Sequence, residues 1–301
     1  MEPVLRDFWE SHRSEYLVDY SEDVSKSFLL NLAHLVTGAG EKRVTITSVH
    51  RKKGKVGGIN DLIRFSRSDK LNKLYGNRNS KIYNVNDFNM WYTGENFRPP
   101  FDAGFDAYLS YDIDSFSGLN YYLPLWVCRL GPSLQIADQA QRILNNFRAV
   151  GPLRNRNFAV VASNPERIRN FFIKNLQQYS DVDIYGKTGL EVVNKNQTLQ
   201  NYNFNICFEN DLYPGYVTEK AIESYLSGCI PVWRGLDKGG FLNKDAIIDV
   251  TDLSFADATQ KVLDVSKDKD LIQHMRCQPI LRATIPLDKI VATLQEKYQS
   301  S

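Results

Sequence analysis

Cysteine and histidine are scarce in this sequence, and neither residue type is arranged for a disulfide framework or a metal site. The four cysteines are Cys128, Cys207, Cys229 and Cys277, and none stands at ligand spacing from another cysteine or from a histidine. Each lies in or beside an apolar stretch, so we expect small core side chains in a reducing compartment. The four histidines are equally scattered. The sequence therefore predicts no metal ion and no other cofactor.

An excess of charge of one sign is also lacking. Lysine and arginine together number 37 against 35 aspartates and glutamates, which leaves a formal net charge of +2. Proteins that bind nucleic acid usually present a strongly basic face, so this balance argues against a nucleic-acid partner. We interpret the one short basic run, residues 51–55, as a solvated loop, with contact to a membrane surface or to an acceptor as the minority alternative.

Long apolar runs are missing as well. Residues 1–20 carry a charge every few positions and contain no apolar segment of the secretory type, and no other run is long enough to cross a bilayer. We therefore expect a cytoplasmic chain without a transmembrane segment. Peripheral membrane contact stays open, and any anchor would lie outside these residues.

The 301 residues do contain enough apolar side chains, 43% of the total, to build two ordinary domains. In the first half, the pattern predicts a helix at 24–36 and strands at 44–48, 81–85, 91–93 and 105–111. A polar, turn-rich segment at 151–157 favours a domain junction. We therefore predict an N-terminal domain at 1–150, a C-terminal domain at 151–285 and a last helix within 286–301 that packs back across the domains.

The second half has the clearer pattern. The apolar run 158–162 suits a parallel strand that is covered on both faces. Ser163 and Asn164, before Pro165, break the run and can cap a helix. The apolar stripe of that helix is expected to comprise Ile168, Phe171, Phe172, Leu176 and Tyr179. A strand at 182–185 completes a β-α-β unit, so the expected class is α/β with a parallel sheet. Further strands are expected at 204–208, 230–233 and 246–250.

The segment 204–235 carries the polar residues that suggest chemistry. Glu209 and Asn210 follow an apolar strand, and parallel sheets bind ligands beyond the carboxyl ends of their strands. Thr218 is a plausible N-cap, which would put Glu219 and Lys220 in a first helical turn that favours an anion. Tyr216 offers a stacking surface, and Glu219 could accept hydrogen bonds from sugar hydroxyls. The same charges are also ordinary decoration of a helix start, and that alternative stays open here.

These residues resemble the donor-binding signature of the α-1,3/1,4-fucosyltransferases, glycosyltransferase family 10. The matching pieces are Phe204-Asn-Ile-Cys-Phe208-Glu209-Asn210, Tyr216-Val-Thr-Glu219-Lys220 and Ile230-Pro231-Val232. The resemblance continues through Ser163-Asn164 and 182–187. It implies that GDP-fucose is held by Asn210, Tyr216, Glu219 and Lys220, with Glu209, Ser163 and Asn164 in the same set. Lys187 stands where the family usually has an arginine that contacts the diphosphate, and a lysine supplies the charge without the bidentate fork.

The first half contains a second matching segment, residues 91–99, which resembles the part of the family that carries the proposed catalytic base. Glu95 takes that place. The stretches 105–111 and 121–125 follow in the family's order, whereas residues 1–80 match poorly, as expected of a domain that reads the acceptor. The heptad repeats and basic amphipathic tail of some bacterial members are not found in this sequence.

The resemblance implies a GT-B type fold, with two Rossmann-like domains whose parallel sheets face each other across a cleft. It further implies inverting transfer of fucose from GDP-β-L-fucose to a hydroxyl, expected to be O3, of an N-acetylglucosamine or glucose unit in an oligosaccharide. Glu95 would act as general base, and Lys220 with Lys187 would stabilise the departing GDP. Whether Glu219 or Glu209 steadies the positive charge of an ion-like sugar is left open.

Three alternatives remain at this point. The donor could be another GDP-deoxysugar, or the chain could be a non-catalytic carbohydrate-binding protein of the same fold. A glycoside hydrolase would need two carboxylates flanking the bond and no nucleotide.

The pair Asp112 and Asp114 is of a kind that binds Mn²⁺ or Mg²⁺ in other transferase folds, but it lies away from the donor signature. Lysine can replace a metal in neutralising charge, so we expect metal-independent activity.

Overall fold

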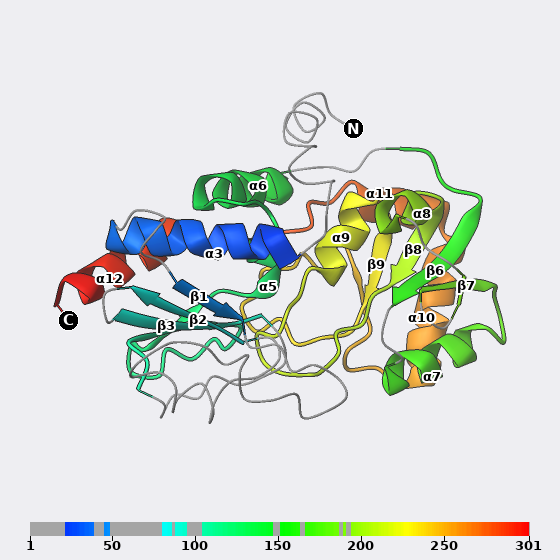
Figure 1. The fold of residues 1–301 in the computed structure, drawn as a ribbon. Helices are drawn as coiled ribbons and strands as arrows, with labels where there is room; N and C mark the ends of the chain where they lie inside the picture. Colours follow the sequence, from blue (N-terminus) through cyan, green and yellow to red (C-terminus); the bar gives the residue numbers. More distant parts are fainter. Residues whose placement is uncertain are drawn as a thin grey trace. The chain divides into compact units, whose positions relative to one another are not determined.

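The computed structural model describes residues 22–38, 45–48, 80–85, 88–94, 104–146, 151–162, 166–186, 189–190 and 194–300. By their internal contacts these residues form two compact units. We call residues 22–137 with 286–300 the first unit and residues 138–285 the second unit. The expected α/β class is confirmed, because each unit combines one five-stranded sheet with helices (Figure 1). The predicted functional domains, 1–150, 151–285 and 286–301, stay a prediction.

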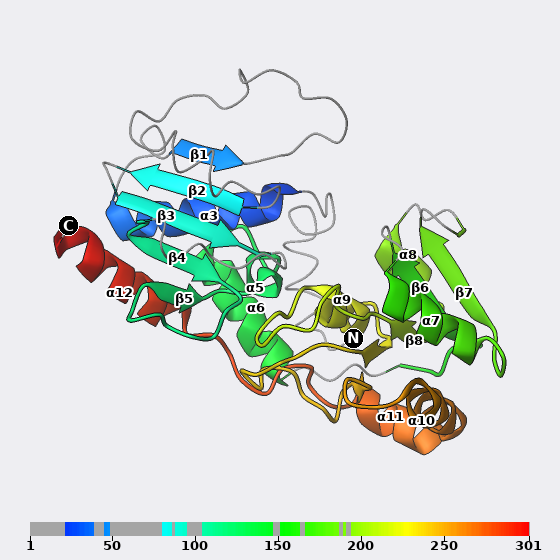
Figure 2. The ribbon, with the colours of Figure 1, turned by 90° about the horizontal axis from the view of Figure 1, so that it is seen from below.

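The sheet of the first unit is mixed, which differs from the all-parallel sheet expected of a Rossmann-like domain. Figure 2 shows its strands side by side in the order of the chain. The first two pairs are antiparallel and the last two are parallel. Only two residues separate the second strand from the third, and such a short connection permits antiparallel pairing alone. The strands are β1 (Thr45–Ser48), β2 (Ser80–Val85), β3 (Phe88–Thr93), β4 (Ala107–Ser110) and β5 (Asn120–Tyr122).

Two long helices of the first unit pack against each other, α3 (Glu22–Thr37) and α12 (Leu287–Ser300). The buried residues of α3 recur at helical spacing and make one apolar face: Phe28, Leu29, Leu32, Ala33 and Val36. The amide of Gln295 donates to the Leu35 carbonyl at 2.7 Å. The short helix α5 (Leu125–Cys128) also contacts α3. None of the described helices combines the length and the apolar character needed to cross a bilayer.

The second unit confirms the predicted parallel sheet. All neighbouring strands run in the same direction, in the order β10-β9-β8-β6-β7. A return to the same edge after every strand needs a crossover connection, and helices supply most of them. The strands are β6 (Arg156–Ala162), β7 (Val182–Gly186), β8 (Tyr202–Ile206), β9 (Ile230–Trp233) and β10 (Ile248–Asp249). The helices are α6 (Leu134–Asn146), within which the two units divide, α7 (Arg167–Leu176), α8 (Lys195–Leu199), α9 (Lys220–Leu226), α10 (Phe255–Lys267) and α11 (Lys269–Arg276).

Side chains cover both faces of this parallel sheet. On one face, Phe158 and Phe204 stack with ring centroids 5.2 Å apart, in a core that also takes in α7, α10 and α11. On the other face, Ala159 packs with Leu199 of α8, and the amide of Asn205 donates to the Ser224 hydroxyl of α9. Burial on both faces explains the continuous apolar run of β9, all four residues of which are buried.

Helix α7 corrects two details of the sequence interpretation. Its N-cap is Glu166, whose carboxylate accepts from the Ile168 and Arg169 amides at 2.8 and 2.6 Å, so the helix starts later than a cap at Ser163 or Asn164 would allow. The stripe was also partly wrong. Phe171 and Tyr179 are 54% and 68% exposed. Ile173 takes the inward position beside Phe172, and Tyr179 lies beyond the end of the helix.

Candidate functional site

The predicted donor-binding residues of the second half follow the ends of three strands of the parallel sheet. Strand β6 ends just before Ser163 and Asn164, β7 ends just before Lys187, and β8 leads into Glu209 and Asn210. Because the strands are parallel, their carboxyl ends meet at the same side of the sheet, which we call the carboxyl edge. Ser163, Asn164, Lys187 and the proposed base Glu95 lie outside the described residues.

Beyond β8 the main chain stays hydrogen-bonded to β9 and to the residue that follows β9. The amide of Cys207 donates to the Val232 carbonyl at 2.9 Å, and the amide of Glu209 donates to the Arg234 carbonyl at 2.9 Å. These bonds extend the pairing of β8 with β9 beyond its last residue pair, Ile206 with Val232. Glu209 is therefore held by its backbone at the carboxyl edge.

The Glu209 carboxylate is buried and surrounded by donors. One oxygen accepts from the Thr218 amide at 2.8 Å and from the Trp233 indole N–H at 3.5 Å. The other accepts from the Thr218 hydroxyl at 2.7 Å and from the Lys220 ammonium at 2.8 Å. Desolvation of a carboxylate is costly unless its oxygens are hydrogen-bonded and its charge is paired, and here both conditions are met.

Thr218 is not the N-cap of the following helix, so that prediction was wrong. Helix α9 begins at Lys220, and its N-cap is Glu219, whose side chain makes no capping hydrogen bond. The Thr218 hydroxyl instead donates to the buried Glu209 carboxylate, and its oxygen accepts from the Lys220 ammonium. Glu219 and Lys220 still stand at the helix start, and both are partly exposed.

Lys220 places a positive charge at the carboxyl edge. Its ammonium lies 2.8 Å from a Glu209 oxygen and 2.9 Å from the Thr218 hydroxyl, and its side chain is 18% exposed. Asn210, the next residue after Glu209, is exposed. The described part of the edge thus combines a fixed ammonium group with an accessible amide, a pair suited to a phosphate and a hydroxylated ligand.

Tyr216 does not present the stacking surface that the sequence suggested. The residue is fully buried. A tight turn accounts for this, since the Tyr216 amide donates to the Tyr213 carbonyl at 2.9 Å and the Gly215 amide donates to the Leu236 carbonyl at 2.8 Å. The turn ties the loop to the segment after β9 and leaves the ring of Tyr216 inside the protein.

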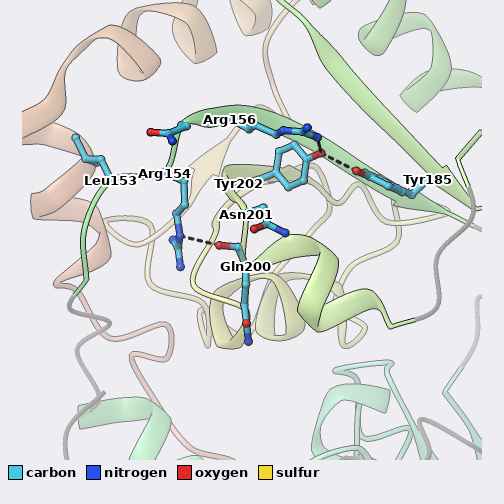
Figure 3. Close-up of a pocket in the computed structure, with 8 residues that line it drawn as sticks. Leu153, Arg154, Arg156, Tyr185, Gln200, Asn201 and Tyr202 are labelled. Carbon is cyan, nitrogen blue, oxygen red and sulfur yellow. Dashed lines mark hydrogen bonds between the residues drawn. The ribbon is translucent and has the colours of Figure 1, made fainter.

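A roomy polar cavity lies elsewhere in the second unit, near the starts of β6 and β8, which we call the amino edge. It measures about 500 Å³ and includes Arg154, Arg156, Tyr185 and Tyr202 in its lining. Figure 3 shows the Arg154 side chain directed at the Gln200 carbonyl and the Tyr185 and Tyr202 hydroxyls bonded to each other. None of the predicted donor-binding residues lines it. Its size alone therefore carries less weight than the chemistry of the carboxyl edge.

The arginines and tyrosines of this cavity serve mainly to join strands and loops. Arg154 donates to the carbonyls of Gly228 and Gln200, and Arg156 donates to Asp183 at 3.1 Å and to Tyr202 at 3.0 Å. Burial raises the pKa of Tyr202, and its hydrogen bonds to Asp183 and Tyr185 raise it further. These groups are largely engaged with one another.

The described residues contain no group of three histidines, cysteines, aspartates or glutamates that could hold a metal ion. Asp112 is buried, and its carboxylate accepts from the Asp114 amide at 3.1 Å. The Asp112 carboxylate thus closes a turn, and the Asp114 side chain is exposed. Metal independence of the activity stays a prediction.

Fold and site together define the class of the second unit. It is a doubly wound α/β domain whose polar residues gather beyond the carboxyl ends of its parallel strands, as in domains that bind nucleotides. Residues 152–275 match the model of glycosyltransferase family 10 (fucosyltransferase), C-terminal part. Through these residues the chain is similar to the C-terminal part of glycosyltransferase family 10.

Individual relatives agree with this assignment. The chain is 30% identical over 225 residues to the α-(1,3)-fucosyltransferase FucT of Helicobacter pylori, a match that covers 64% of this chain and 45% of that protein. It is 33% identical over 176 residues to the 4-galactosyl-N-acetylglucosaminide 3-α-L-fucosyltransferase FUT6 of Gorilla gorilla gorilla, which covers 56% of this chain and 45% of the relative. The chain thus spans less than half the length of these curated relatives.

A solved structure shows the same fold. The crystal structure of an α1,3-fucosyltransferase with GDP-fucose superposes with a TM-score of 0.57 at 25% identity. The superposition covers 70% of this chain and 74% of that one. The same enzyme class has also been solved with GDP, with the same TM-score of 0.57.

Proposed function

We propose that this chain is an inverting fucosyltransferase that binds GDP-β-L-fucose at the carboxyl edge of the second unit and transfers fucose to a glycan acceptor. The observation that carries the proposal is the Lys220 ammonium, held at that edge by Glu209 and Thr218 within the segment that matches the family. The names of the relatives favour O3 of an N-acetylglucosamine unit as the acceptor hydroxyl, and the family resemblance of the sequence keeps a glucose unit as the alternative.

The carboxyl edge has to stabilise the leaving group, GDP. When the bond between fucose C1 and the β-phosphate oxygen breaks, GDP gains negative charge. Preorganised cations stabilise such charge without reorganisation at the moment of reaction. Lys220 supplies one, Lys187 supplies a second from the end of β7, and Asn210 with Glu219 offers hydrogen bonds to the nucleotide sugar. With two lysines in these roles, no metal ion is required.

The acceptor needs a base. Its hydroxyl becomes a competent nucleophile as its proton passes to a carboxylate, while the new C1–O bond forms on the face opposite to GDP. The configuration at C1 is thereby inverted from β to α. We assign the role of proton acceptor to Glu95, because residues 91–99 resemble the segment of the family that carries the proposed catalytic base.

Replacing Lys220 tests the donor site. We expect Lys220→Met to weaken GDP binding about ten- to hundredfold, because a charge-assisted hydrogen bond contributes about 1.5–3 kcal/mol. Isothermal titration calorimetry with GDP and GDP-fucose measures this change. The matched control is Lys195→Met, since Lys195 also pairs with a buried glutamate, Glu223, at 2.5 Å. Equal GDP affinity in wild type and Lys220→Met would remove the donor site from the carboxyl edge.

Replacing Glu95 tests the chemistry separately from binding. We expect Glu95→Gln to lower turnover by about two to four orders of magnitude, the usual contribution of a general base, with GDP affinity unchanged. Product formation is followed by mass spectrometry with a panel of GDP-sugars and acceptors, which also separates fucose from other GDP-deoxysugars. Turnover at the wild-type level in Glu95→Gln would exclude Glu95 as the base. A chain that binds GDP-fucose but turns over no acceptor in the panel would favour the non-catalytic alternative.

A further inference from the structure

We propose that Glu209 is a positioning residue, which sets the place of the Lys220 ammonium at the carboxyl edge and does not itself touch the nucleotide sugar. The proposal rests on the function proposed above and refines it. It assigns to Glu209 a role different from the donor contact that its place in the sequence suggested.

Burial and hydrogen bonding separate Glu209 from any ligand. Its side chain is 0% exposed, whereas that of Lys220 is 18% exposed. A carboxylate offers about four acceptor positions, and four donors of the described residues occupy them: the Thr218 amide, the Thr218 hydroxyl, the Lys220 ammonium and the Trp233 indole. No acceptor position is left for a sugar or ribose hydroxyl. Glu209 therefore acts on the ligand through Lys220.

Lys220 is also held through its backbone. The Ser224 hydroxyl donates to the Lys220 carbonyl at 2.7 Å, and the Asn205 amide of β8 donates to the Ser224 hydroxyl at 2.5 Å. Asn205 and Glu209 belong to one continuous segment, β8 and its extension along β9. The same segment thus holds the main chain of Lys220 at one point and its ammonium at another.

Such a double attachment matters for a lysine because its four-carbon side chain is flexible. An unrestrained ammonium would lose side-chain entropy when it closed on a phosphate. Glu209 and Thr218 remove much of that freedom before the ligand arrives. Preorganisation of this kind raises affinity without adding a contact to the ligand.

A second ion pair in the same unit provides the comparison. Lys195 of α8 and Glu223 of α9 lie 2.5 Å apart, with side chains that are 26% and 8% exposed. This pair joins two helices and lies outside the set of strand-end residues that make up the carboxyl edge. If an ion pair of this unit affects nucleotide binding only through general stability, both pairs should behave alike.

A double-mutant cycle tests the proposal, with GDP affinity measured by calorimetry for wild type, Glu209→Gln, Lys220→Met and the double variant. Glu209→Gln presents an amide N–H₂ to groups that are themselves donors, so we expect GDP binding to weaken about tenfold. The double variant should bind GDP as Lys220→Met does, within about twofold, because Glu209 acts through the missing ammonium. Glu223→Gln should leave GDP affinity within about twofold of wild type.

Two results would overturn this proposal alone. One is an additive cycle, in which Glu209→Gln weakens binding by the same factor with and without Lys220. The other is GDP affinity unchanged by Glu209→Gln while Lys220→Met weakens it, which would leave the donor site standing. If Lys220→Met leaves GDP affinity unchanged, both the donor site at the carboxyl edge and this proposal are wrong. If Glu209→Gln does not fold, as judged by circular dichroism and thermal melting, Glu209→Asp takes its place. Asp keeps the charge on a shorter side chain, and we expect a smaller loss of affinity with the same non-additivity.

Discussion

At the scale of single residues, two buried thiols give the second unit groups that ionise only at high pH. Burial raises the pKa of Cys207 to about 12 and that of Cys229 to about 12. The Cys229 thiol donates to the carbonyls of Leu199 and Tyr202 at 3.1 and 3.3 Å. The sequence-based expectation of small core side chains is confirmed for Cys128, Cys207 and Cys229, which are buried, and Cys277 is partly exposed.

These pKa values predict an alkaline loss of stability. A group with a raised pKa in the folded state binds its proton more tightly there than in the unfolded chain. Its stabilising contribution is complete below the ordinary thiol pKa of 9.0 and is lost as the pH rises from there to about 12. The free energy of unfolding should therefore fall above pH 9, by at most about 1.4 kcal/mol per pH unit for each thiol.

The variant Cys229→Ser measures how much the Cys229 thiol contributes to this loss of stability at high pH. The serine hydroxyl can donate to the same carbonyls and does not ionise in this range, so the fall in unfolding free energy above pH 9 should be less steep than in wild type. Urea unfolding at a series of pH values from 8 to 11 measures both slopes. An identical slope in the two proteins would contradict the account of Cys229.

At the scale of elements, the end of α9 shows how a loop and a helix are joined. Gly228 follows α9 with a φ of +78°, and a Cβ atom there would overlap the guanidinium of Arg154. Arg154 in turn donates to the carbonyls of Gly228 and Gln200, so it satisfies acceptors beyond both α8 and α9. The backbone conformation at this position favours glycine, and an added Cβ atom would also force the Arg154 guanidinium to move.

Gly228→Ala should therefore cost more than the backbone conformation alone. The left-handed conformation costs about 1–2 kcal/mol for a residue with a Cβ atom, and the overlap with Arg154 adds to it. The matched control is Gly240→Ala, because Gly240 has a φ of +66° and nothing within 4 Å of an added Cβ. Urea unfolding of both variants should show the larger destabilisation in Gly228→Ala. An equal loss of unfolding free energy in the two variants would mean that the Arg154 side chain moves aside at no energetic cost.

The elements also show where sequence patterns succeed. The strands predicted at 158–162, 182–185 and 230–233 agree with β6, β7 and β9 within one or two residues. The runs 158–162 and 230–233 are continuous and apolar, as expected of parallel strands that are covered on both faces. The N-cap of α9 was missed by one residue, because it is Glu219 and not Thr218. Thr218 has the right chemistry for a cap, but its hydroxyl donates to Glu209, nine positions earlier in the chain, and its oxygen accepts from the Lys220 ammonium. Local propensity cannot reveal that competition.

At the scale of the whole molecule, the location of the candidate site was predictable and the orientation of its side chains was not. A parallel sheet brings the ends of β6, β7 and β8 to one edge, so Glu209, Asn210 and Lys220 could be assigned to it from their order alone. The burial of Tyr216 and the inward direction of Glu209 depend on how the 211–218 loop turns back against the segment after β9. Contacts of that kind join residues that no local pattern connects. The same holds for Trp233, which bonds to Glu209 and had no signal of its own beyond an apolar strand.

The central claim is that the carboxyl edge of the second unit holds the nucleotide sugar, and a crystal structure of this chain with GDP tests it most directly. The account predicts a diphosphate oxygen within about 3 Å of the Lys220 ammonium, with Glu209 still bonded to the Thr218 amide. GDP bound instead in the cavity of Arg156 and Tyr202, at the amino edge of the same sheet, would contradict it.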